Sequence, residues 1–408
     1  MDIKNKLRKN VLLSYIYSFL LGLDITSAIW VLYLAFKGMS LVQIGALEAI
    51  YHITSLLFEL PTGAIADVYG KKLTVVLGRA ASVVSCLLMI SSSSFWGFAL
   101  AFVISAAGMN LHSGAAEALS YDSLKALGEE GSYKRIWGKV NFLIGTAQGV
   151  ALILGGILAD IKFLYAYILG GLIQGAAFIT ALGFSEPPEG EVNERGTGNS
   201  LIYQVKTSIK VLRERKVVLY LILFSALVGS LQTTVFFYSQ QFFSDMGYSK
   251  TAIAVICALG CFIEAVTSRY AYKIEKVLKL MGSLIIIALI SVGSLVGLGF
   301  FRSYSIIFFL FISITGGVAY TIFSAYINER LPSEYRATIL SFDGLCFSLF
   351  MIAVFPLFGV LAHKLDFHMT FGLLALLYIP VLVLLTIKIN KYCKNSLGDV
   401  KNDRISFK

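Results

Sequence analysis

The sequence predicts an all-α polytopic membrane protein with twelve transmembrane helices in two six-helix bundles. Composition is the first observation behind this prediction. Of 408 residues, 57% are hydrophobic and only 14% are charged, against about 25% charged residues in soluble domains. The second observation is that apolar runs of about 20 residues, each long enough to cross a ~30 Å hydrocarbon core, recur along the whole chain. The third is one long polar connection after the sixth run, which divides the chain into two halves.

Short clusters of charged residues separate each apolar run from the next. The first run follows the basic segment MDIKNKLRKN. It is too long for a signal peptide and has no small-residue cleavage site, so it is predicted to be the first helix. The predicted spans are 11–36, 41–66, 73–94, 96–120, 138–159, 163–184, 217–243, 251–271, 277–300, 304–328, 338–362 and 368–389.

Five cysteines, an odd number, occur in the chain, and most of them lie inside predicted spans. This placement argues against a disulfide framework and against a metal cluster. Cys257 and Cys261 share a helix face, but two thiols alone make a poor metal site. The sequence therefore predicts no metal site and no cofactor.

The formal net charge of +10 is unevenly distributed between the two sides of the predicted bundles. Twelve spans place both termini and the long connection on one side, and that side collects nearly all the basic residues. Cytoplasmic loops carry such an excess of Lys and Arg. Both termini are therefore predicted to be cytoplasmic, and the charge does not indicate a nucleic-acid partner. The basic residues on the other side are Lys37, Lys162, Lys250, Arg302 and Lys364.

The polar connection, residues 185–216, begins with a segment rich in Pro and Gly. Its later part, 201–211, has apolar residues spaced as in an amphipathic helix on a membrane surface. We predict that it is the cytoplasmic linker between an N-terminal bundle (1–184) and a C-terminal bundle with a short tail (217–408). The similar segments GGILAD and FGVLAH close the fifth and eleventh spans. Such internal repetition is typical of secondary transporters, whose two bundles rock about a central site.

A polar motif, GAIADVYGKK, lies between the second and third spans. It resembles the signature of the major facilitator superfamily, which has the form G-x-x-x-D-[RK]-x-G-[RK]-[RK]. Val68 departs from the signature, because the family usually has a basic residue there. The twelve spans, the long linker and the repeated halves resemble the family over essentially the whole chain. The matching residues are Gly63, Asp67, Gly70, Lys71 and Lys72.

The resemblance implies that this motif acts in gating. Gly63 would let its helix approach a neighbour closely. Asp67 would accept hydrogen bonds from the N-terminus of the eleventh span, near Ala337–Ser341, which joins the bundles on the cytoplasmic side in the outward-open state. The alternative is that Asp67 caps its own loop. Lys71 and Lys72 either anchor the loop at lipid headgroups or act only as topology signals.

The fifth predicted span contains GTAQGVALILGG. It resembles a degraded form of the glycine-rich helix G-x-x-x-G-P-x-x-G-G of the family's drug-efflux (drug:proton antiporter) branch, without the proline and with different spacing. The resemblance implies close packing of this helix against a neighbour. The glycines are Gly145, Gly149, Gly155 and Gly156.

Asp24 lies almost at the centre of the first predicted span, beside Thr26 and Ser27. An ionisable group at mid-membrane is energetically costly and marks a candidate functional site. The resemblance implies that helices one, four, seven and ten line the central cavity. Asp24 is therefore the predicted proton-coupling residue, and a structural role is the alternative.

The fourth predicted span carries Asn110 near mid-membrane and His112 shortly after it. His112 could carry a proton, donate to a substrate, or be a hydrogen-bonded packing residue. The span lacks the arginine that many members of the superfamily place there, so their proton relay does not transfer to this chain. Glu117 and Asp122 are predicted to join a cytoplasmic network with Lys134 and Arg135.

Further acids lie inside predicted spans, and their roles stay open. Glu59 and Glu264 lie at about the same depth in the two halves and are predicted to stabilise gating interfaces. Pro61 follows Glu59 and frees a helical carbonyl. The intramembrane acids of open role are Glu48, Glu59, Glu117, Glu264 and Asp343.

Spans seven and ten mix hydrogen-bonding groups with aromatic surface, which suits a moderately polar or amphipathic organic ligand. Trp30 adds to this wall or belongs to an interfacial aromatic belt. The residues predicted for the substrate cavity and proton coupling are Asp24, Trp30, Asn110, His112, Gln232, Tyr238, Tyr320 and Ser324.

No metalloprotease, hydrolase or nucleotide-binding signature occurs in the sequence. The chain is therefore predicted not to be an enzyme, and the energy for transport is predicted to come from an ion gradient or from the substrate's own gradient. The sequence predicts a monomeric secondary transporter in the bilayer of the bacterial cytoplasmic membrane, which exports a small organic or amphipathic compound in exchange for protons. The alternatives are a nutrient or metabolite importer of the same fold, a lipid-linked flippase and a non-transporting receptor.

Overall fold

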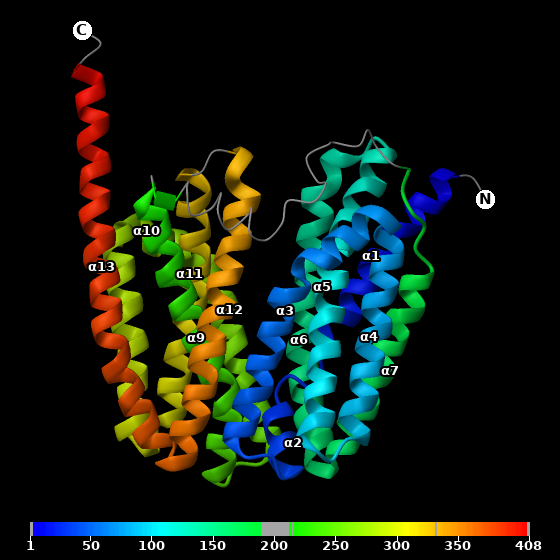
Figure 1. Cartoon of the computed structure of the whole chain (residues 1–408), viewed down its shortest axis with the longest axis horizontal. Coiled ribbons are helices and arrows are strands. Elements are labelled where there is room, and N and C mark those ends of the chain that lie inside the picture. Colours follow the sequence, from blue (N-terminus) through cyan, green and yellow to red (C-terminus); the bar gives the residue numbers. More distant parts are fainter. Residues whose placement is uncertain (1–2, 189–211, 214, 331–332, 406–408) are drawn as a thin grey trace. The chain divides into compact units, whose positions relative to one another are not determined.

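The computed structural model describes residues 3–188, 212–213, 215–330 and 333–405, with side chains described except at 60, 63, 64, 67, 327–330, 333–338, 340 and 394–405. Within these ranges the chain is helical and contains no strand (Figure 1). Two single-turn 3₁₀ helices, Glu130–Ser132 and Arg302–Tyr304, precede α6 and α11. The helices are α1 (Ile3–Gly22), α2 (Trp30–Phe36), α3 (Leu41–Tyr69), α4 (Lys71–Ser91), α5 (Phe95–Ala126), α6 (Tyr133–Ile161), α7 (Phe163–Leu182), α9 (Lys216–Asp245), α10 (Lys250–Phe300), α11 (Ser305–Arg330), α12 (Ser333–Lys364) and α13 (Phe367–Ile405).

Ten helices in the described part of the chain are long and apolar enough to cross a membrane. One of them, α10, holds two predicted spans. Its 51 residues correspond to ~76 Å, more than twice the ~30 Å hydrocarbon core. Lys279, with φ 56° and ψ 179°, divides α10 into two helices. The first predicted span, 11–36, is shared between α1 and α2. Each of the twelve predicted spans therefore corresponds to one of these helices or to part of one, except that the first is divided between two.

Two compact units make up the chain. Unit 1 comprises Met1–Ser200 and Gln240–Ala258, and unit 2 comprises Leu201–Ser239 and Leu259–Lys408. The end of α9 and the beginning of α10 thus belong to unit 1. The bundle boundaries at residues 184 and 217 stay a prediction, and the predicted amphipathic helix at 201–211 lies outside the described residues.

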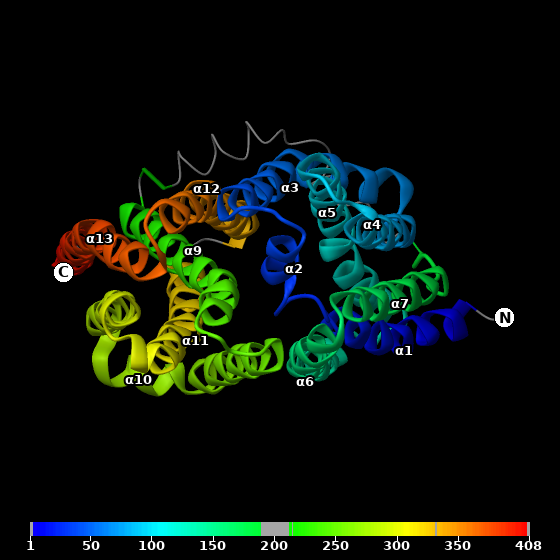
Figure 2. The same cartoon turned by 90° about the horizontal axis from the view of Figure 1, so that it is seen from below.

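The core of unit 1 forms where α1, α4, α5 and α7 meet (Figure 2). Tyr17 packs edge-on against Phe184, with 5.7 Å between the ring centroids. A Cβ at Gly78 would lie 2.8 Å from the carbonyl oxygen of Gly108, so α4 and α5 pack at backbone distance. The buried residues of this core are Tyr17, Val75, Ala115, Leu119, Ala181 and Phe184.

Aromatic rings fill part of the core of unit 2. The ring of Tyr238 packs against Phe355 and Phe358, with centroid distances of 4.5 and 4.6 Å, and Phe358 continues to Phe371 at 5.2 Å. The Tyr238 hydroxyl donates to the Phe355 carbonyl at 3.2 Å, which satisfies its polar end. The side chain is fully buried. The prediction that Tyr238 lines a cavity is therefore wrong, because its ring points into the core of the unit.

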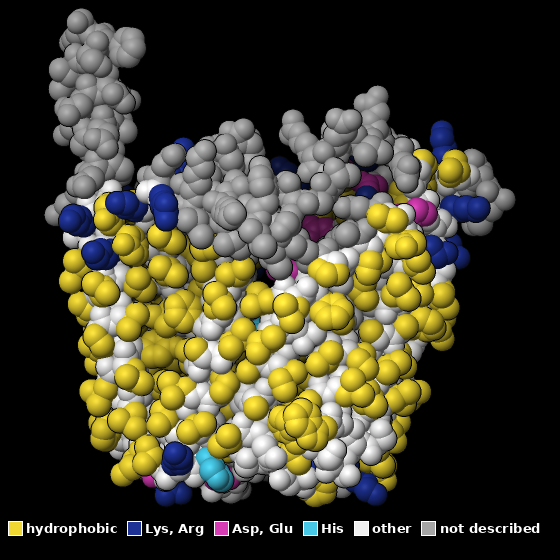
Figure 3. Space-filling model, in the orientation of Figure 1, with side chains coloured by type: hydrophobic (Ala, Val, Ile, Leu, Met, Phe, Trp, Pro, Cys, Tyr) yellow, Lys and Arg dark blue, Asp and Glu magenta, His cyan; other side chains and the backbone are white. Residues whose placement is uncertain are grey.

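Hydrophobic side chains cover most of the face shown in Figure 3, and Lys and Arg gather at the ends of the helices. Exposed apolar residues on α7 and α13 include Leu172 (67%), Ile179 (69%) and Leu376 (66%). An apolar exterior of this kind is stable when lipid is the surrounding solvent. The surface and the candidate spans together fit a multi-pass membrane protein.

Candidate functional site

The first membrane span is broken near its centre. α1 ends at Gly22 and α2 begins at Trp30, and residues 23–29 between them are not regular helix. The carboxylate of Asp24 accepts hydrogen bonds from the backbone N–H of Thr26 at 3.2 Å and from its hydroxyl at 3.0 Å. The Asp24 side chain is exposed. Non-helical backbone at membrane depth occurs where it is buried in protein or lines water, and it forms substrate and ion sites in transporters.

The local sequence favours this break. Side chains of Asp24 and Thr26 compete with the helix for backbone hydrogen bonds. Two contacts with α6 then hold the chain on either side of Asp24. A Cβ at Gly22 would lie 2.6 Å from the carbonyl oxygen of Ile144, and a Cβ at Gly155 would overlap the carbonyl oxygen of Ile25. Sequence reasoning missed the break, although the cluster of Gly, Asp, Thr and Ser is a turn signal.

Gln240, from the part of α9 that belongs to unit 1, completes the hydrogen bonding of the break. Its side-chain amide nitrogen donates to the carbonyl of Ser27 at 2.8 Å, and its amide oxygen accepts from the backbone N–H of Val31 at 3.2 Å. A broken helix leaves backbone groups without intrahelical partners. Gln240, which is fully buried, pairs with two of them.

Side chains of α3 lie close to the break. Glu48 and His52 are one helical turn apart and almost buried, with 3.5 Å between a carboxylate oxygen and Nε2. The ring of Tyr51 packs against those of His52 and Phe102, with centroid distances of 5.5 and 6.5 Å. Trp30, at the start of α2, packs edge-on against Phe102, with 5.7 Å between the ring centroids. Sequence reasoning missed Tyr51 and His52, although the i,i+4 spacing of Glu48 and His52 places them on one helix face.

Unit 2 brings two predicted residues together. The side-chain amide of Gln232 on α9 donates to Glu264 on α10 at 2.9 Å. On α11, a Cβ at Gly316 would overlap the Gln232 amide, and a Cβ at Gly317 would overlap the Glu264 carbonyl. The paired glycines therefore let α11 pack directly on this polar pair. Tyr320, one turn further along α11, is 76% exposed, and Ser324 follows it on the same helix.

Two predicted cavity residues of α5 have other surroundings. The side-chain amide of Asn110 is bonded at both ends to Ser55 on α3, with distances of 2.9 and 2.6 Å. His112 is 5% exposed and lies inside unit 1. Asn110 thus joins α5 to α3, whereas the buried ring of His112 packs near Tyr17 of α1. Their predicted roles in transport stay predictions.

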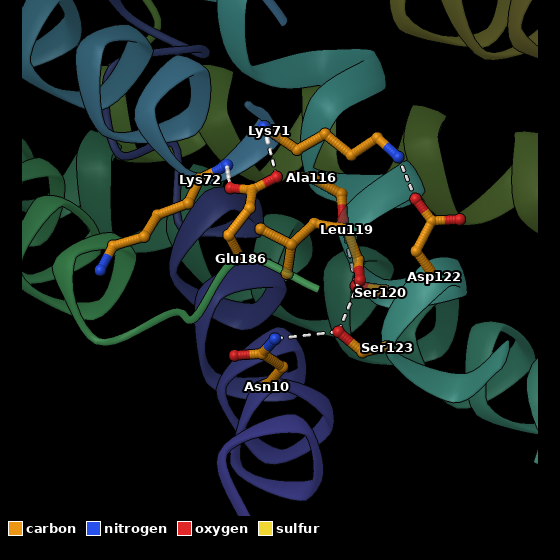
Figure 4. Close-up of polar contacts among 9 residues, drawn as sticks. All are labelled: Asn10, Lys71, Lys72, Ala116, Leu119, Ser120, Asp122, Ser123 and Glu186. Carbon is orange, nitrogen blue, oxygen red and sulfur yellow. Dashed lines mark hydrogen bonds and ion pairs between the residues drawn. The ribbon is translucent and has the colours of Figure 1, made fainter. Parts of the chain in front are cut away.

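The last residues of the signature motif hold the chain that leaves α7 (Figure 4). Gly70, with φ 89°, occupies the N-cap of α4 and offers no side-chain cap. The carboxylate of Glu186 caps the helix instead, accepting from the backbone N–H groups of Lys71 and Lys72 at 2.8 and 2.7 Å. Lys71 pairs through its ammonium group with Asp122. Gly63 and Asp67 lie on α3, and the contact predicted for Asp67 falls outside the described side chains.

Asn10 on α1 completes this network. Its side chain exchanges two hydrogen bonds with the backbone of Ser185, at 2.7 and 2.8 Å, and donates to Ser123 on α5 at 2.9 Å. Ser14 and Ser120, one turn further in, share a hydrogen bond of 2.7 Å. The network thus joins α1, α4, α5 and the start of the linker.

The predicted partners of the α5 acids are wrong. Asp122 pairs with Lys71, and Glu117 accepts a hydrogen bond from the hydroxyl of Tyr133 at 2.7 Å. Neither acid forms an ion pair with Lys134 or Arg135 among the described contacts. The sequence proximity of charges is a weak guide here, because helix packing brings the α4 lysine to Asp122.

The α6 glycines divide into two groups. Gly145 and Gly149 have open space where a Cβ would lie, so the close packing predicted for them is wrong within unit 1. Gly155 contacts the break, and Gly156 contacts the beginning of α10, where a Cβ would lie 2.7 Å from the Lys250 carbonyl oxygen. Of these four glycines, only Gly155 and Gly156 make close contacts within unit 1.

The same end of α6 caps α10. The carboxylate of Asp160 accepts hydrogen bonds from the backbone N–H groups of Lys250 and Thr251, both at 2.8 Å, and lies 3.7 Å from the Lys250 ammonium group. A carboxylate at a helix N-terminus satisfies unpaired N–H groups and interacts favourably with the helix dipole. Asp160 thereby holds the first turn of α10 within unit 1.

Two predicted acids are not joined to these clusters. Glu59 is exposed on α3, and Asp343 on α12 has one buried carboxylate oxygen without a hydrogen-bond partner. No group of three His, Cys, Asp or Glu in the described part of the chain could hold a metal ion. The candidate functional site is therefore the break in the first span, where Asp24 bonds to Thr26.

A family model described as Major Facilitator Superfamily matches residues 12–356. The chain belongs to the Major Facilitator Superfamily. The uncharacterized MFS-type transporter YxaM of Bacillus subtilis (strain 168) is 26% identical over 384 residues, which cover 92% of this chain and 95% of the relative. The tetracycline resistance protein, class G, of Vibrio anguillarum is 26% identical over 154 residues, 38% of this chain and 37% of the relative.

The crystal structure of the nucleoside transporter NupG resembles this superfamily member with a TM-score of 0.71. Its sequence is 15% identical, and the match covers 96% of this chain and 100% of NupG. This likeness shows the fold. The predicted major facilitator fold is thereby confirmed, and the chain is a multi-pass membrane protein of a transporter family.

Proposed function

We propose that this Major Facilitator Superfamily member is a secondary active transporter that exports a small organic or amphipathic compound across the bacterial cytoplasmic membrane, in exchange for protons. The observation that carries the proposal is the exposed carboxylate of Asp24 in the broken first span. A carboxylate inside a membrane span is costly and is retained where it binds ions or substrate. Broken helices supply such sites in transporters.

Competition between the substrate and a proton for the carboxylate of Asp24 explains how export is exchanged for proton entry. In its charged form, Asp24 accepts hydrogen bonds or pairs with a positive group of the substrate. A proton that binds Asp24 removes the charge and weakens these interactions, which favours release of the substrate. Loss of the proton on the other side of the membrane restores the charged form. Exchange follows because substrate and proton use the same oxygen atoms.

Alternating access requires contacts that form in one state and separate in another. The segment Gln240–Ala258 supplies candidates, because Gln240 bonds to the broken span and Asp160 caps α10. We assign to these polar contacts the role of a reversible latch. Hydrogen bonds suit this role since water replaces them when they open.

Efflux is favoured by the similarity to a tetracycline resistance protein over part of the chain. Import is the second candidate, because the fold is also that of a nucleoside transporter. We further propose that the exporter is a monomer and that both of its termini lie in the cytoplasm. Accumulation of a compound in cells that express the protein, instead of depletion, would select import.

The transport assay uses purified protein in liposomes with an imposed pH gradient and a panel of labelled organic compounds. We expect at least one compound to move against its gradient when protons move the opposite way. Asp24→Asn should abolish this coupling, because the amide cannot bind and release a proton. Glu130→Gln, at an exposed carboxylate in the 3₁₀ helix before α6, is the matched control and should behave like the wild type.

Failure of every compound to respond to the pH gradient would contradict proton-coupled export. Retained coupling in Asp24→Asn would remove Asp24 from the mechanism.

A further inference from the structure

A buried polar cluster lies inside unit 1, apart from the transport site. Arg79 on α4 is 3% exposed and donates to the side-chain oxygen of Gln174 on α7 at 3.0 Å. The guanidinium carbon lies 5.9 Å from the ring centroid of Tyr17 on α1. The Tyr17 ring in turn meets the ring of His112 on α5 at 6.5 Å and 75°. Four helices therefore contribute one polar side chain each to this cluster.

Several polar atoms of the cluster have no hydrogen-bond partner. They are Nε of Arg79, both ring nitrogens of His112 and the hydroxyl oxygen of Tyr17. The three residues are 3%, 5% and 1% exposed, so water outside the protein does not reach them. Buried polar groups are almost always hydrogen-bonded, and each exception needs an explanation. Three neighbouring side chains hold these atoms, and one occupant that accepts hydrogen bonds would satisfy several of them.

The charge of Arg79 narrows the nature of this occupant. Arginine stays protonated in proteins, and a buried charge without a partner is strongly destabilising. In the described part of the chain, the ion pairs join other residues, and no carboxylate pairs with Arg79. Water can satisfy hydrogen bonds but brings no charge. A negative occupant would supply the counter-charge that Gln174 and the Tyr17 ring do not provide.

The hydrogen-bonding groups and the packing around them further restrict the chemical class of the occupant. The Nε–H of Arg79 only donates, the Tyr17 hydroxyl can donate, and neutral His112 donates from one nitrogen. An occupant that only accepts hydrogen bonds fits these groups. A Cβ at Gly78 would lie 2.9 Å from the Cβ of His112, so α4 and α5 are closely packed beside the cluster. This packing favours a small spherical ion over an organic carboxylate.

We propose that unit 1 contains a binding site for a small monovalent inorganic anion of the chloride class, formed by Arg79, Tyr17 and His112. The anion neutralises Arg79 and stabilises the packing of α1, α4, α5 and α7. This site lies apart from Asp24 and does not depend on the direction or substrate of transport.

Thermal unfolding of the purified full-length protein tests the site. Sodium chloride replaces sodium gluconate at constant ionic strength, and we expect a saturable rise in the unfolding midpoint. Arg79→Met removes the charge and should make the midpoint independent of chloride. Tyr17→Phe keeps the ring and should weaken chloride binding about tenfold through the lost hydrogen bond. Arg8→Met, at an exposed arginine of α1, should retain the chloride response.

Bromide provides a test that needs no variant. In crystals of the wild-type protein grown with sodium bromide, an anomalous scattering peak should lie beside Arg79 Nε and the Tyr17 hydroxyl. A chloride-independent wild-type midpoint, or a crystal without this peak, would overturn the proposal. Transport is not measured in either experiment, so the result stands separately from the proposed function.

Discussion

At the beginning of α4, Gly70 has no side chain to cap the helix, and Glu186, which is distant in sequence, caps it instead. Gly70 is the N-cap residue, and its φ of 89° favours glycine. A Cβ at Gly70 would lie 2.9 Å from the carboxyl carbon of Glu186. Absence of a side chain at Gly70 thus makes room for the carboxylate that caps the helix. The lysines of the motif contribute their backbone N–H groups to this contact as well as their charge.

Glu186→Gln should loosen the first turn of α4. The amide keeps one acceptor oxygen but loses the charge that favours the helix N-terminus, an effect of about 1 kcal/mol. Hydrogen exchange of the Lys71 and Lys72 amides should become faster, as measured by mass spectrometry on the detergent-solubilised protein. Glu130→Gln, at an exposed acid, should leave these amides unchanged. Equal exchange in Glu186→Gln and wild type would contradict the capping role.

At the scale of one element, α6 shows how the position of a glycine decides its role. Gly155 allows the broken first span to approach, whereas Gly145 faces open space. Both residues lie on the same helix and belong to the same sequence motif. Close contact therefore depends on which face of α6 each glycine occupies and on what packs there.

Gly155→Ala and Gly145→Ala should have opposite effects on stability. At Gly155, the new methyl group overlaps the Ile25 carbonyl, and such overpacking costs about 1–3 kcal/mol. At Gly145, nothing opposes the methyl group, and alanine favours the helix by up to about 1 kcal/mol. Thermal unfolding in detergent should show a lower midpoint for Gly155→Ala and an equal or higher one for Gly145→Ala. A shared direction of change would argue against this packing.

The membrane helices could be predicted from sequence because a span needs only a long apolar run, and twelve such runs are present. The break at Asp24 escaped prediction because a few polar residues do not interrupt a run of that length. Tyr238 was assigned to the cavity from its helix alone, while the direction of its side chain places it in the aromatic core. Arg79 and Glu186 could not be recognised, because their partners come from helices far away in the chain.

At the scale of the whole molecule, the two compact units do not follow the two halves of the sequence. The segment Gln240–Ala258 belongs to unit 1, while the rest of α9 and α10 belongs to unit 2. Both helices therefore pass from one unit to the other. A change of state that separates the units must either bend these helices or release the segment from Asp160 and from the broken span.

Asp160→Asn should favour release of this segment. The amide keeps an acceptor for α10 but loses the charge that stabilises its first turn, a change of about 1 kcal/mol. Spin labels at Lys162 and Lys364, both predicted on the outer side, should show a larger population of long distances by pulsed electron resonance. The matched control is Asp366→Asn, because Asp366 caps α13 through the backbone N–H of Met369. An unchanged distance distribution in Asp160→Asn would exclude the latch.

The anchoring of Ser185 and Glu186 has a mechanical consequence. Because these residues are bonded to Asn10 and to the first turn of α4, the connection between the halves is attached to α1 and α4 as well as to α7, from which it emerges. Tension in that connection is transmitted to the helix that carries Arg79 and to the helix that ends beside Asp24. Tension in the connection between the halves therefore acts on the broken first span.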